Sequence, residues 1–492
     1  MKILMVSSEA TPFAKSGGLA DAVSALARAL RREGHDARIV LPRYYSIDQK
    51  DLKRVDGPLG VPLGEREEWG AVFESTLPDS DVPVYFIEHE GYFGRDGIYG
   101  NRQESDFADN PRRFSFFSRA AFQLCRRLSW IPDILHAHDW PSSLVPVYYC
   151  ALEAEGDFAE TATVLTIHNL GYQGIYPKEH FSALGLPWEA FHELGLEFYD
   201  ALNLLKAGIT SAEKLTTVSP SYSYEIQTPE QGCRLDGLLR HRSADLVGIL
   251  NGVDLDDWNP ATDRYLPVRY SPDDMAGKAA CKAALQREFG LPEDPGIPIV
   301  GMVSRLADQK GIGELFGSDY GAVAPLCRDM ALQFVALGSG DAWCEAELRS
   351  LSERLPNFKA RVGYSEKIAH LIEAGSDFFL MPSRYEPCGL NQMYSLRYGT
   401  LPIVHRTGGL ADTVSNYDQN SGAGTGFMFD HLTPRAIYDT VGWAVWAWYN
   451  KQDHLEAMRQ RAMRLEFSWQ LSAREYVSLY ENALLAKRDE RR

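Results

Sequence analysis

One short phrase occurs twice in the chain and constrains the fold more than any other feature. It reads K-S-G-G-L-A-D from Lys15 to Asp21 and R-T-G-G-L-A-D from Arg406 to Asp412, and each copy follows a strand-like run. Paired glycines let a ligand approach the backbone, and the N–H groups that open a following helix favour an anion. The repetition suggests two similar α/β halves that face each other across a cleft, each suited to phosphate binding.

The composition bounds the class of protein. The chain has 492 residues, of which 45% are hydrophobic, enough for more than one core. Its 67 acidic and 50 basic residues give a formal charge of -17, which argues against general binding to nucleic acid or to an anionic membrane. The seven cysteines form no C-x-x-C pair, and the start of the chain carries no signal-like apolar region. We therefore expect a cytoplasmic protein with reduced cysteines.

Short apolar or β-branched runs alternate with helical stretches in two series. This alternation predicts parallel sheets with helices on both faces. The first helix is marked by an apolar stripe from Leu19 to Leu30, with Gly34 placed to end it. The first series of strands is expected at residues 3–8, 37–41, 82–88, 133–138, 162–168, 214–219 and 248–250, and the second at 299–304, 332–337, 360–363, 378–382 and 401–404.

The two series place two doubly wound, Rossmann-like domains in tandem. Residues 259–298 carry six prolines around one short helix, so the connection lies in or just before them. We expect a first domain at residues 1–253, a second at 254–467, and a last helix within 468–492 that crosses back to the first domain. Open sheets of this kind bind ligands at the carboxyl ends of their strands, so the facing edges should form a deep cleft.

A set of motifs in this order resembles bacterial glycogen synthases and plant starch synthases. Besides K-S-G-G-L-A-D, the set comprises H-A-H-D-W at 136–140, T-I-H-N-L at 166–170, L-N-G-V-D at 250–254, V-S-R-L at 303–306 with Lys310, and P-S-R-Y-E-P-C-G-L at 382–390. The match runs from Met1 to about Trp469. It implies a GT-B fold and the retaining transfer of glucose from ADP-glucose, bound by the second domain, to the non-reducing end of an α-1,4-glucan, bound by the first.

The chemistry of such a transfer needs cations at the departing diphosphate, where negative charge grows. The resemblance gives this role to Arg305 and Lys310, which follow the run 299–304, and to Lys15 with the amides of Gly17 and Gly18. From the residues alone, Arg305 and Lys310 could instead lie on a solvated surface loop. Gly17 and Gly18 could likewise belong to a plain strand-to-helix turn.

The resemblance also implies a donor pocket around Glu386, which would bind the glucosyl hydroxyls or support the positive ring. The other donor-binding residues that it implies are Asn251, Tyr364, Cys388, Gly389, Leu390 and Asn391. Tyr364 would stack on adenine, although stacking alone does not select that base. Many family members have Thr where this chain has Asn391, which leaves a side-chain role for that residue in doubt. Cys388 has no His neighbour in sequence, which disfavours a nucleophile.

Three further residues belong to the sugar-binding side in this resemblance. His168 would lie beside the glucosyl C1 with its main-chain carbonyl near the cationic ring, while Asp21 and Asp139 would lie by the sugar. An isolated histidine at a strand end is otherwise a core or surface residue. Where many members read H-D-W-H, this chain has Pro141, which could reshape the acceptor side.

We expect no metal and no other cofactor. His136, His138 and Asp139 are a possible ligand set, and Asp254 to Asp256 form a D-x-D, but the cations already named suffice for the diphosphate. The expected partners are ADP-glucose and an α-1,4-glucan such as glycogen or a maltooligosaccharide, without nucleic acid or membrane. A related transferase that uses UDP-glucose or a small acceptor, and a non-catalytic glucan-binding homologue, stay open as alternatives.

Overall fold

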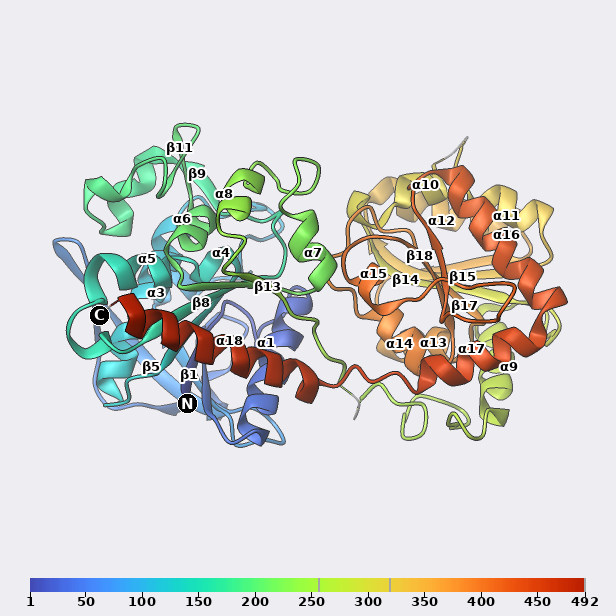
Figure 1. Ribbon diagram of the computed structural model, residues 1–492, viewed down its shortest axis with the longest axis horizontal. Coiled ribbons are helices and arrows are strands. Elements are labelled where there is room, and N and C mark those ends of the chain that lie inside the picture. Colours follow the sequence, from blue (N-terminus) through green and yellow to red (C-terminus); the bar gives the residue numbers. More distant parts are fainter. Residues whose placement is uncertain (255–256, 318–319, 491–492) are drawn as a thin grey trace. The chain divides into compact units, whose positions relative to one another are not determined.

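The computed structural model describes residues 1–254, 257–317 and 320–490, and the chain divides into two compact units (Figure 1). Unit 1 comprises Met1–Gly252 and Trp469–Arg492, and unit 2 comprises Val253–Ser468. Each unit buries apolar side chains in cores of its own. Across the described residues, no helix is both long and apolar enough to cross a bilayer.

The main sheet of unit 1 is built around seven parallel strands. Their order across the sheet is β13-β12-β8-β7-β1-β2-β6, so the chain order reverses between β1 and β7, as in doubly wound dinucleotide-binding folds. The central strand, β1, has four of its five residues buried. The bounds are β1 Lys2–Val6, β2 Asp36–Pro42, β6 Pro83–Glu88, β7 Ile134–His138, β8 Ala162–Ile167, β12 Lys214–Thr217 and β13 Leu246–Gly248.

Antiparallel strands in unit 1 depart from the parallel sheet that the sequence predicts. Strand β5 (Arg66–Thr76) pairs antiparallel with β6, and β3 (Lys53–Arg54) and β4 (Leu59–Leu63) pair with β5. A separate small sheet contains β9 (Ile175–Pro177), β10 (Glu197–Phe198) and β11 (Ala201–Asn203). The outer half of β5 is exposed and charged, so the apolar run that marked the other strands is missing there.

Helices at both ends of the chain cover one part of this sheet. Helix α1 (Gly18–Arg32) buries the predicted apolar stripe, and Gly34, with a φ of +86°, follows its end. Figure 1 shows the last helix, α18 (Trp469–Glu490), in red beside α1 in blue. Its inner face joins the core of unit 1 through Trp469, Tyr476 and Tyr480. The other helices of unit 1 include α3 Asn110–Arg127, α4 Asp139–Ser142, α5 Leu144–Tyr148, α6 Leu204–Ser211, α7 Pro220–Glu225 and α8 Asp236–His241.

Unit 2 contains a parallel sheet in the order β16-β15-β14-β17-β18-β19, which reverses between β14 and β17. The strands are β14 Ile299–Leu306, β15 Gln333–Gly340, β16 Phe358–Val362, β17 Phe378–Met381, β18 Leu401–His405 and β19 Phe427–Phe429. Its helices include α9 Ala276–Phe289, α10 Ile312–Phe316, α11 Val323–Asp329, α12 Ala342–Arg354, α13 Glu366–Gly375, α14 Asn391–Arg397, α15 Gly408–Thr413, α16 Pro434–Asn450 and α17 Gln452–Met463.

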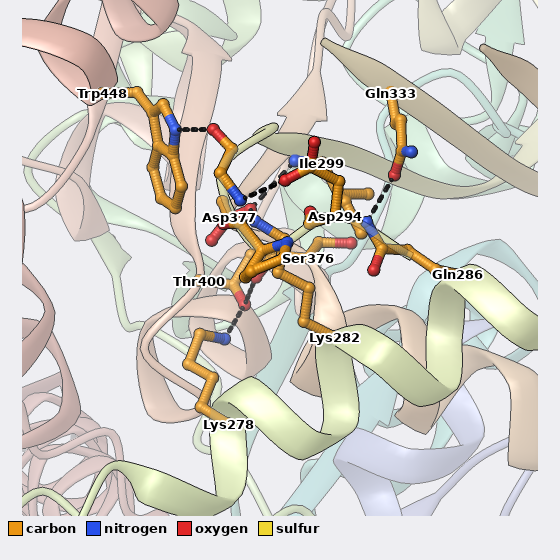
Figure 2. A network of polar contacts seen from close by, with 12 residues as sticks. Lys278, Lys282, Gln286, Asp294, Ile299, Gln333, Ser376, Asp377, Thr400 and Trp448 are labelled. Carbon is orange, nitrogen blue, oxygen red and sulfur yellow. Dashed lines mark hydrogen bonds and ion pairs between the residues drawn. The ribbon is translucent and has the colours of Figure 1, made fainter. Parts of the chain in front are cut away.

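Two buried lysines of α9 anchor this helix at the amino ends of the central strands (Figure 2). Lys278 Nζ donates to the carbonyls of Ala374 and Tyr398, both at 3.0 Å, and to Thr400 Oγ1 at 2.7 Å. Lys282 Nζ lies 2.8 Å from Asp377 Oδ2, which also accepts from the backbone of β14. These contacts lie at the amino ends of the strands. They therefore stabilise the sheet without occupying the carboxyl ends, where ligands of such sheets bind.

Candidate functional site

The carboxyl ends of β14 and β17 border a pocket of about 180 Å³ in unit 2. These two strands are the neighbours between which the chain order reverses, and ligands of doubly wound sheets bind at this point. The predicted residues that line the pocket are Arg305, Lys310, Glu386, Gly389, Leu390 and Asn391. Segments far apart in the sequence therefore meet in one place.

Glu386 and Lys310 form an ion pair in the wall of this pocket. Lys310 Nζ lies 2.5 Å from Glu386 Oε2, and their side chains are only 18% and 8% exposed. Ser383 Oγ donates to the same carboxylate oxygen at 2.8 Å. Ser383 belongs to the motif P-S-R-Y-E-P-C-G-L, but its sequence position alone did not indicate this contact. Because the carboxylate offsets the ammonium charge, the pocket already balances one of its two cations.

Arg305 provides the other cation. It is exposed as the last residue but one of strand β14, and its Nη2 donates to the side-chain carbonyl of Gln309 at 3.2 Å. The strand runs two residues further than predicted, so Arg305 belongs to β14, and Lys310 ends a short 3-10 turn that follows it. Among the described residues the Arg305 side chain forms no ion pair, so its charge is available to an anionic ligand.

The start of α14 closes the pocket. Gly389 has a φ of +71°, a conformation that disfavours other residues, and it turns the chain into the helix. Asn391 Nδ2 donates to the carbonyl of Val303 at 2.8 Å, so this side chain ties α14 to β14. The backbone of residues 389–391 thus keeps its place at the pocket through a contact that the sequence did not indicate.

Two predicted donor residues of unit 2 do not line the pocket. Tyr364 follows β16 and is 80% exposed, which suits a ring that meets a ligand and not one packed in the core. Cys388 is buried, and its carbonyl accepts a hydrogen bond of 2.9 Å from Gln392 Nε2. Cys388 therefore contributes its backbone at this point, while its side chain is packed in the protein.

The second copy of the glycine phrase packs against the backbone of the loop that carries Glu386. A Cβ atom at Gly408 would lie 2.0 Å from the carbonyl oxygen of Glu386, and one at Gly409 would lie 1.9 Å from that of Cys388. Gly409 N also donates to the carbonyl of Glu386 at 3.0 Å. Protein backbone thus occupies the space that the sequence suggested for phosphate, and these glycines pack α15 against the Glu386 loop.

The first copy lies in unit 1 after β1 and has open space around it. Among the described residues, no heavy atom outside their chain neighbours and local helix lies within 4 Å of a Cβ built at Gly17 or Gly18. Lys15 Nζ lies 2.8 Å from Asp21 Oδ2, with side chains that are 51% and 36% exposed. The two copies therefore share a sequence but differ in what approaches their glycines.

Glu9 is a residue of this region that sequence reasoning missed. Its buried carboxylate accepts hydrogen bonds from the amide and hydroxyl of Ser16, from the amide of Gly17 at 3.3 Å, and from the hydroxyl of Tyr99 at 2.6 Å. An anionic group thus already binds the amides ahead of α1. The signal available in the sequence was an acid directly after the strand-like run of residues 3–8.

Asp139 and His168 are held together after β7 and β8. Asp139 Oδ1 accepts from the backbone N–H of His168 at 2.7 Å and from that of Asn169 at 3.4 Å. Burial raises the pKa of the Asp139 carboxyl to about 7, the two N–H donors oppose this, and the charge of Glu9 adds to it. Asp139 therefore fixes the backbone that presents His168.

Burial keeps the imidazoles of this region neutral. It lowers the pKa of His168 and of His136 to about 3 and that of His138 well below the ordinary value. His138 Nδ1 lies 3.1 Å from His168 Nε2. His136 contacts Tyr480 Oη with Nδ1 and Thr166 Oγ1 with Nε2, so both of its nitrogens are engaged and it does not complete the metal site considered for H-A-H-D.

Two other motif residues lie near the point in the sequence where the chain passes from unit 1 to unit 2. Asn251 is buried after β13, and its Oδ1 finds no hydrogen-bond partner within the described part of the chain. Asp256 of the D-x-D motif lies outside the described residues. Lys15, Gly17, Gly18, Asp21, Asp139, His168 and Asn251 all belong to unit 1, whereas the remaining predicted residues belong to unit 2.

Family models and relatives match nearly the whole chain. The model described as the starch synthase catalytic domain matches residues 2–241, and that described as glycosyl transferases group 1 matches residues 285–464. A glycogen synthase of Treponema denticola is 57% identical over 487 residues, which cover 99% of each chain. Glycogen synthase 1 of Geobacter metallireducens is 48% identical and covers 98% of this chain and 96% of its own length.

Solved structures agree with this match. The catalytic domain of starch synthase IV from Arabidopsis thaliana, bound to ADP and acarbose, has a TM-score of 0.88 at 32% identity and covers 98% of this chain and 99% of that one. Sucrose-phosphate synthase from Thermosynechococcus elongatus, at 16% identity and a TM-score of 0.60, shares the fold over 99% of each chain. The chain therefore belongs to the glycogen and starch synthase family, and it is a hexosyltransferase with the two-domain α/β fold of the GT-B type.

Proposed function

We propose that the protein transfers glucose from ADP-glucose to the non-reducing end of an α-1,4-glucan with retention of configuration. The observation that carries this proposal is the pocket of unit 2, where two cations, a carboxylate and the backbone that opens α14 converge at the strand-order reversal. The solved relative bound to ADP and acarbose supports both the donor base and a glucan-like acceptor.

The pocket would bind the donor through its diphosphate. As the bond between C1 and the phosphate oxygen breaks, negative charge grows on the phosphate, and Arg305 and Lys310 would stabilise it. Loss of one such donor typically costs about 3 to 4 kcal/mol of transition-state stabilisation. The amides of Gly389, Leu390 and Asn391 would add N–H groups, and the exposed ring of Tyr364 would stack on the base.

The residues around the sugar would support the positive ring. Glu386 would bind glucosyl hydroxyls while its pair with Lys310 holds both groups in place. His168 is neutral at pH 7, so its imidazole does not repel a cation, and Asp139 fixes the peptide that carries its carbonyl oxygen. Asp139 and Asp21 would contact sugar hydroxyls.

Lys15 with the amide of Gly18 would add a second set of phosphate donors, and the Gly17 amide would join them by leaving the Glu9 carboxylate. Asn251 and the Cys388 backbone would complete the donor contacts. The pair between Lys15 and Asp21 is solvent-exposed, and such pairs contribute at most about 1 kcal/mol. A diphosphate could therefore take over Lys15 at little cost.

We infer departure and attack on one face of the sugar, with the leaving phosphate accepting the proton of the attacking glucan hydroxyl. Glu386 is paired with Lys310 and so is a weak nucleophile in this arrangement. Trapping and mass spectrometry of the enzyme with a slow donor analogue tests this route. A glucosyl group covalently bound to Glu386 would contradict it.

The direct experiment compares ADP-glucose with UDP-glucose, each with and without glycogen. We expect labelled glucose to enter glycogen from ADP-glucose in preference, with α-1,4 linkages in the product. Transfer from UDP-glucose alone would favour another donor, and glucan binding without turnover of either sugar would favour a non-catalytic homologue.

Donor hydrolysis without glucan gives a further test. Water is an acceptor at high concentration, so a transferase must exclude it from the reacting carbon. We expect nucleotide release from ADP-glucose to be far slower without glycogen than with it. A hydrolysis rate close to the transfer rate would contradict water exclusion.

A further inference from the structure

Three side chains that commonly bind metal ions lie together in unit 2, apart from the residues of the pocket. One ligand atom each of Asp257, Glu366 and His370 lies within 4.8 Å of the other two. Within the described ranges this is the only group of three or more such residues. Glu366 and His370 are four residues apart on α13 and so share one face of that helix, while Asp257 comes from the segment that precedes α9.

His370 has the orientation of a metal-binding histidine. Its side chain is completely buried, and its Nδ1 lies 2.8 Å from Asp263 Oδ2, which also accepts a hydrogen bond of 2.6 Å from the hydroxyl of Tyr398. The carboxylate therefore holds the proton on Nδ1 and leaves the lone pair on Nε2. Histidine ligands usually donate their other N–H to a carboxylate in this way.

The Nε2 atom of His370 is buried and finds no hydrogen-bond partner anywhere in the described chain. Buried polar atoms in native proteins nearly always have a partner, so an orphan of this kind needs an explanation. Because Asp263 occupies the Nδ1 side of the ring, Nε2 is the nitrogen left for the carboxylates of Asp257 and Glu366. A cation between the three groups would satisfy it.

Aromatic stacking fixes the third member of the group. The indole of Trp258 stacks on the His370 ring, with centroids 3.8 Å apart and planes 13° from parallel, and on the ring of Tyr394 at 3.9 Å and 5°. Asp257 is the chain neighbour of Trp258. The carboxylate of Asp257 therefore lies beside that of Glu366, close enough for one cation to bind both.

We propose that Asp257, Glu366 and His370 bind one divalent transition-metal cation through His370 Nε2 and an oxygen of each carboxylate. One imidazole with two carboxylates suits Mn²⁺, Fe²⁺, Co²⁺ or Zn²⁺ better than Ca²⁺ or Mg²⁺, which prefer oxygen ligands. Water would fill the remaining positions. The ion would hold the start of α13 against the segment before α9, so its role is structural and separate from the sugar transfer.

Titration of the EDTA-treated full-length chain with Co²⁺ tests the site. We expect saturable binding of one ion, with visible absorption bands of nitrogen and oxygen ligands and without the near-ultraviolet bands of a thiolate. Bound Co²⁺ should raise the thermal unfolding midpoint, because a ligand that binds only the folded state stabilises it. Mn²⁺ bound to the wild-type chain should show the nitrogen spin-echo modulation of one imidazole.

Matched variants decide which residues bind the ion. Asp257 is exposed and Glu366 is partly exposed, and Asp257→Asn and Glu366→Gln keep the size of the side chain. Both variants should therefore fold and bind Co²⁺ at least about tenfold more weakly. Asp453→Asn, in the first turn of α17, removes an exposed acid outside the group and should bind as the wild type does.

Three results would overturn the site. They are no saturable binding of Co²⁺ or Mn²⁺ by the wild-type chain, binding that Asp257→Asn and Glu366→Gln leave unchanged, and binding with thiolate bands. Unfolding curves of the metal-free variants identify any loss of folding. If a variant is unfolded, the spin-echo measurement on the wild type decides alone, and its lack of imidazole nitrogen would refute the proposal.

Discussion

Among single residues, Lys310 should affect both turnover and the stability of the fold, because it forms an ion pair with Glu386. Lys310→Ala should lower turnover by about 10² to 10³-fold, as for the loss of one donor to a developing anion. It also leaves the buried carboxylate of Glu386 without its cation, with the Ser383 hydroxyl still donating to it, so some stability should be lost too. Steady-state kinetics and thermal unfolding measure the two effects.

The double variant Lys310→Met with Glu386→Gln separates these effects. It removes both charges, so stability should partly recover while turnover stays low. Lys50→Ala, at an exposed lysine of unit 1, is the control and should change neither quantity. Recovery of turnover together with stability would show that Lys310 only supports the fold.

Asp139 should give the protein a pH dependence that a single substitution can isolate. Its pKa is about 7 in the folded chain against 3.8 ordinarily, so the folded state binds the proton more tightly. The stability that this provides is complete below about pH 4 and is lost as the pH rises through 7. Asn keeps an oxygen for the His168 amide and tolerates the φ of +56° at this position.

The unfolding free energies of the wild type and Asp139→Asn, from urea titrations at several pH values, test this. The wild type should lose stability relative to the variant between pH 4.5 and 7.5. The comparison cancels other buried acids such as Glu373. A difference that stays flat or grows with pH would contradict the expected protonation.

Some residues of the site could be predicted from sequence and others could not. Motif order and strand position sufficed for Arg305, Lys310 and Glu386, because side chains that follow neighbouring parallel strands meet at one edge. Glu9 was not predicted, because its role depends on hydrogen bonds to the backbone of residues 16 and 17, which the residue type alone does not reveal.

At the scale of elements, the two copies of the glycine phrase should respond differently to the same substitution. Gly18→Ala adds a methyl group in open space at the start of α1, so stability should hold or rise, while the affinity for ADP-glucose should fall if the donor approaches there. Gly409→Ala places a methyl group against the Cys388 carbonyl and should cost about 1 to 3 kcal/mol.

Thermal unfolding and the KM for ADP-glucose measure these outcomes side by side. Gly409→Ala should also lower activity, because it displaces the loop that carries Glu386. Equal losses of stability in both variants would mean that the first copy is packed as the second is. An unchanged KM in Gly18→Ala would remove Gly18 from the donor site.

The elements themselves were predictable where burial was uniform. Strands β1, β8 and β17, and the first five residues of β14, appear as mainly apolar runs because both faces of a parallel sheet are covered. Strand β5 begins with three consecutive charged residues, and β3 and β10 have two residues each. Their pairing with neighbouring strands creates these elements, and no local sequence pattern predicts them.

At the scale of the whole molecule, unit 1 is discontinuous and depends on the end of the chain. Helix α18 places Trp469, Tyr476, Leu479 and Tyr480 in its core, and Lys487 pairs with Glu213 at 3.1 Å. Burial of one large side chain contributes about 1.5 to 3 kcal/mol, so these four together rival the 5 to 15 kcal/mol that typically stabilises a domain.

A fragment of residues 1–252 should therefore fail to unfold cooperatively, whereas residues 1–252 joined through a short glycine linker to residues 469–492 should do so. The joint is feasible because a Cβ at Gly252 would lie 2.4 Å from the nitrogen of Trp469.

Residues 253–468 should fold alone, since Val253 N donates to the Phe467 carbonyl at 2.6 Å and so joins the two ends of that unit. Urea unfolding followed by circular dichroism compares the three. If residues 1–252 alone unfold with the midpoint and slope of the joined fragment, α18 contributes no stability to unit 1. The free energy gained by burying its four large side chains would then be offset by the entropy cost of ordering the helix.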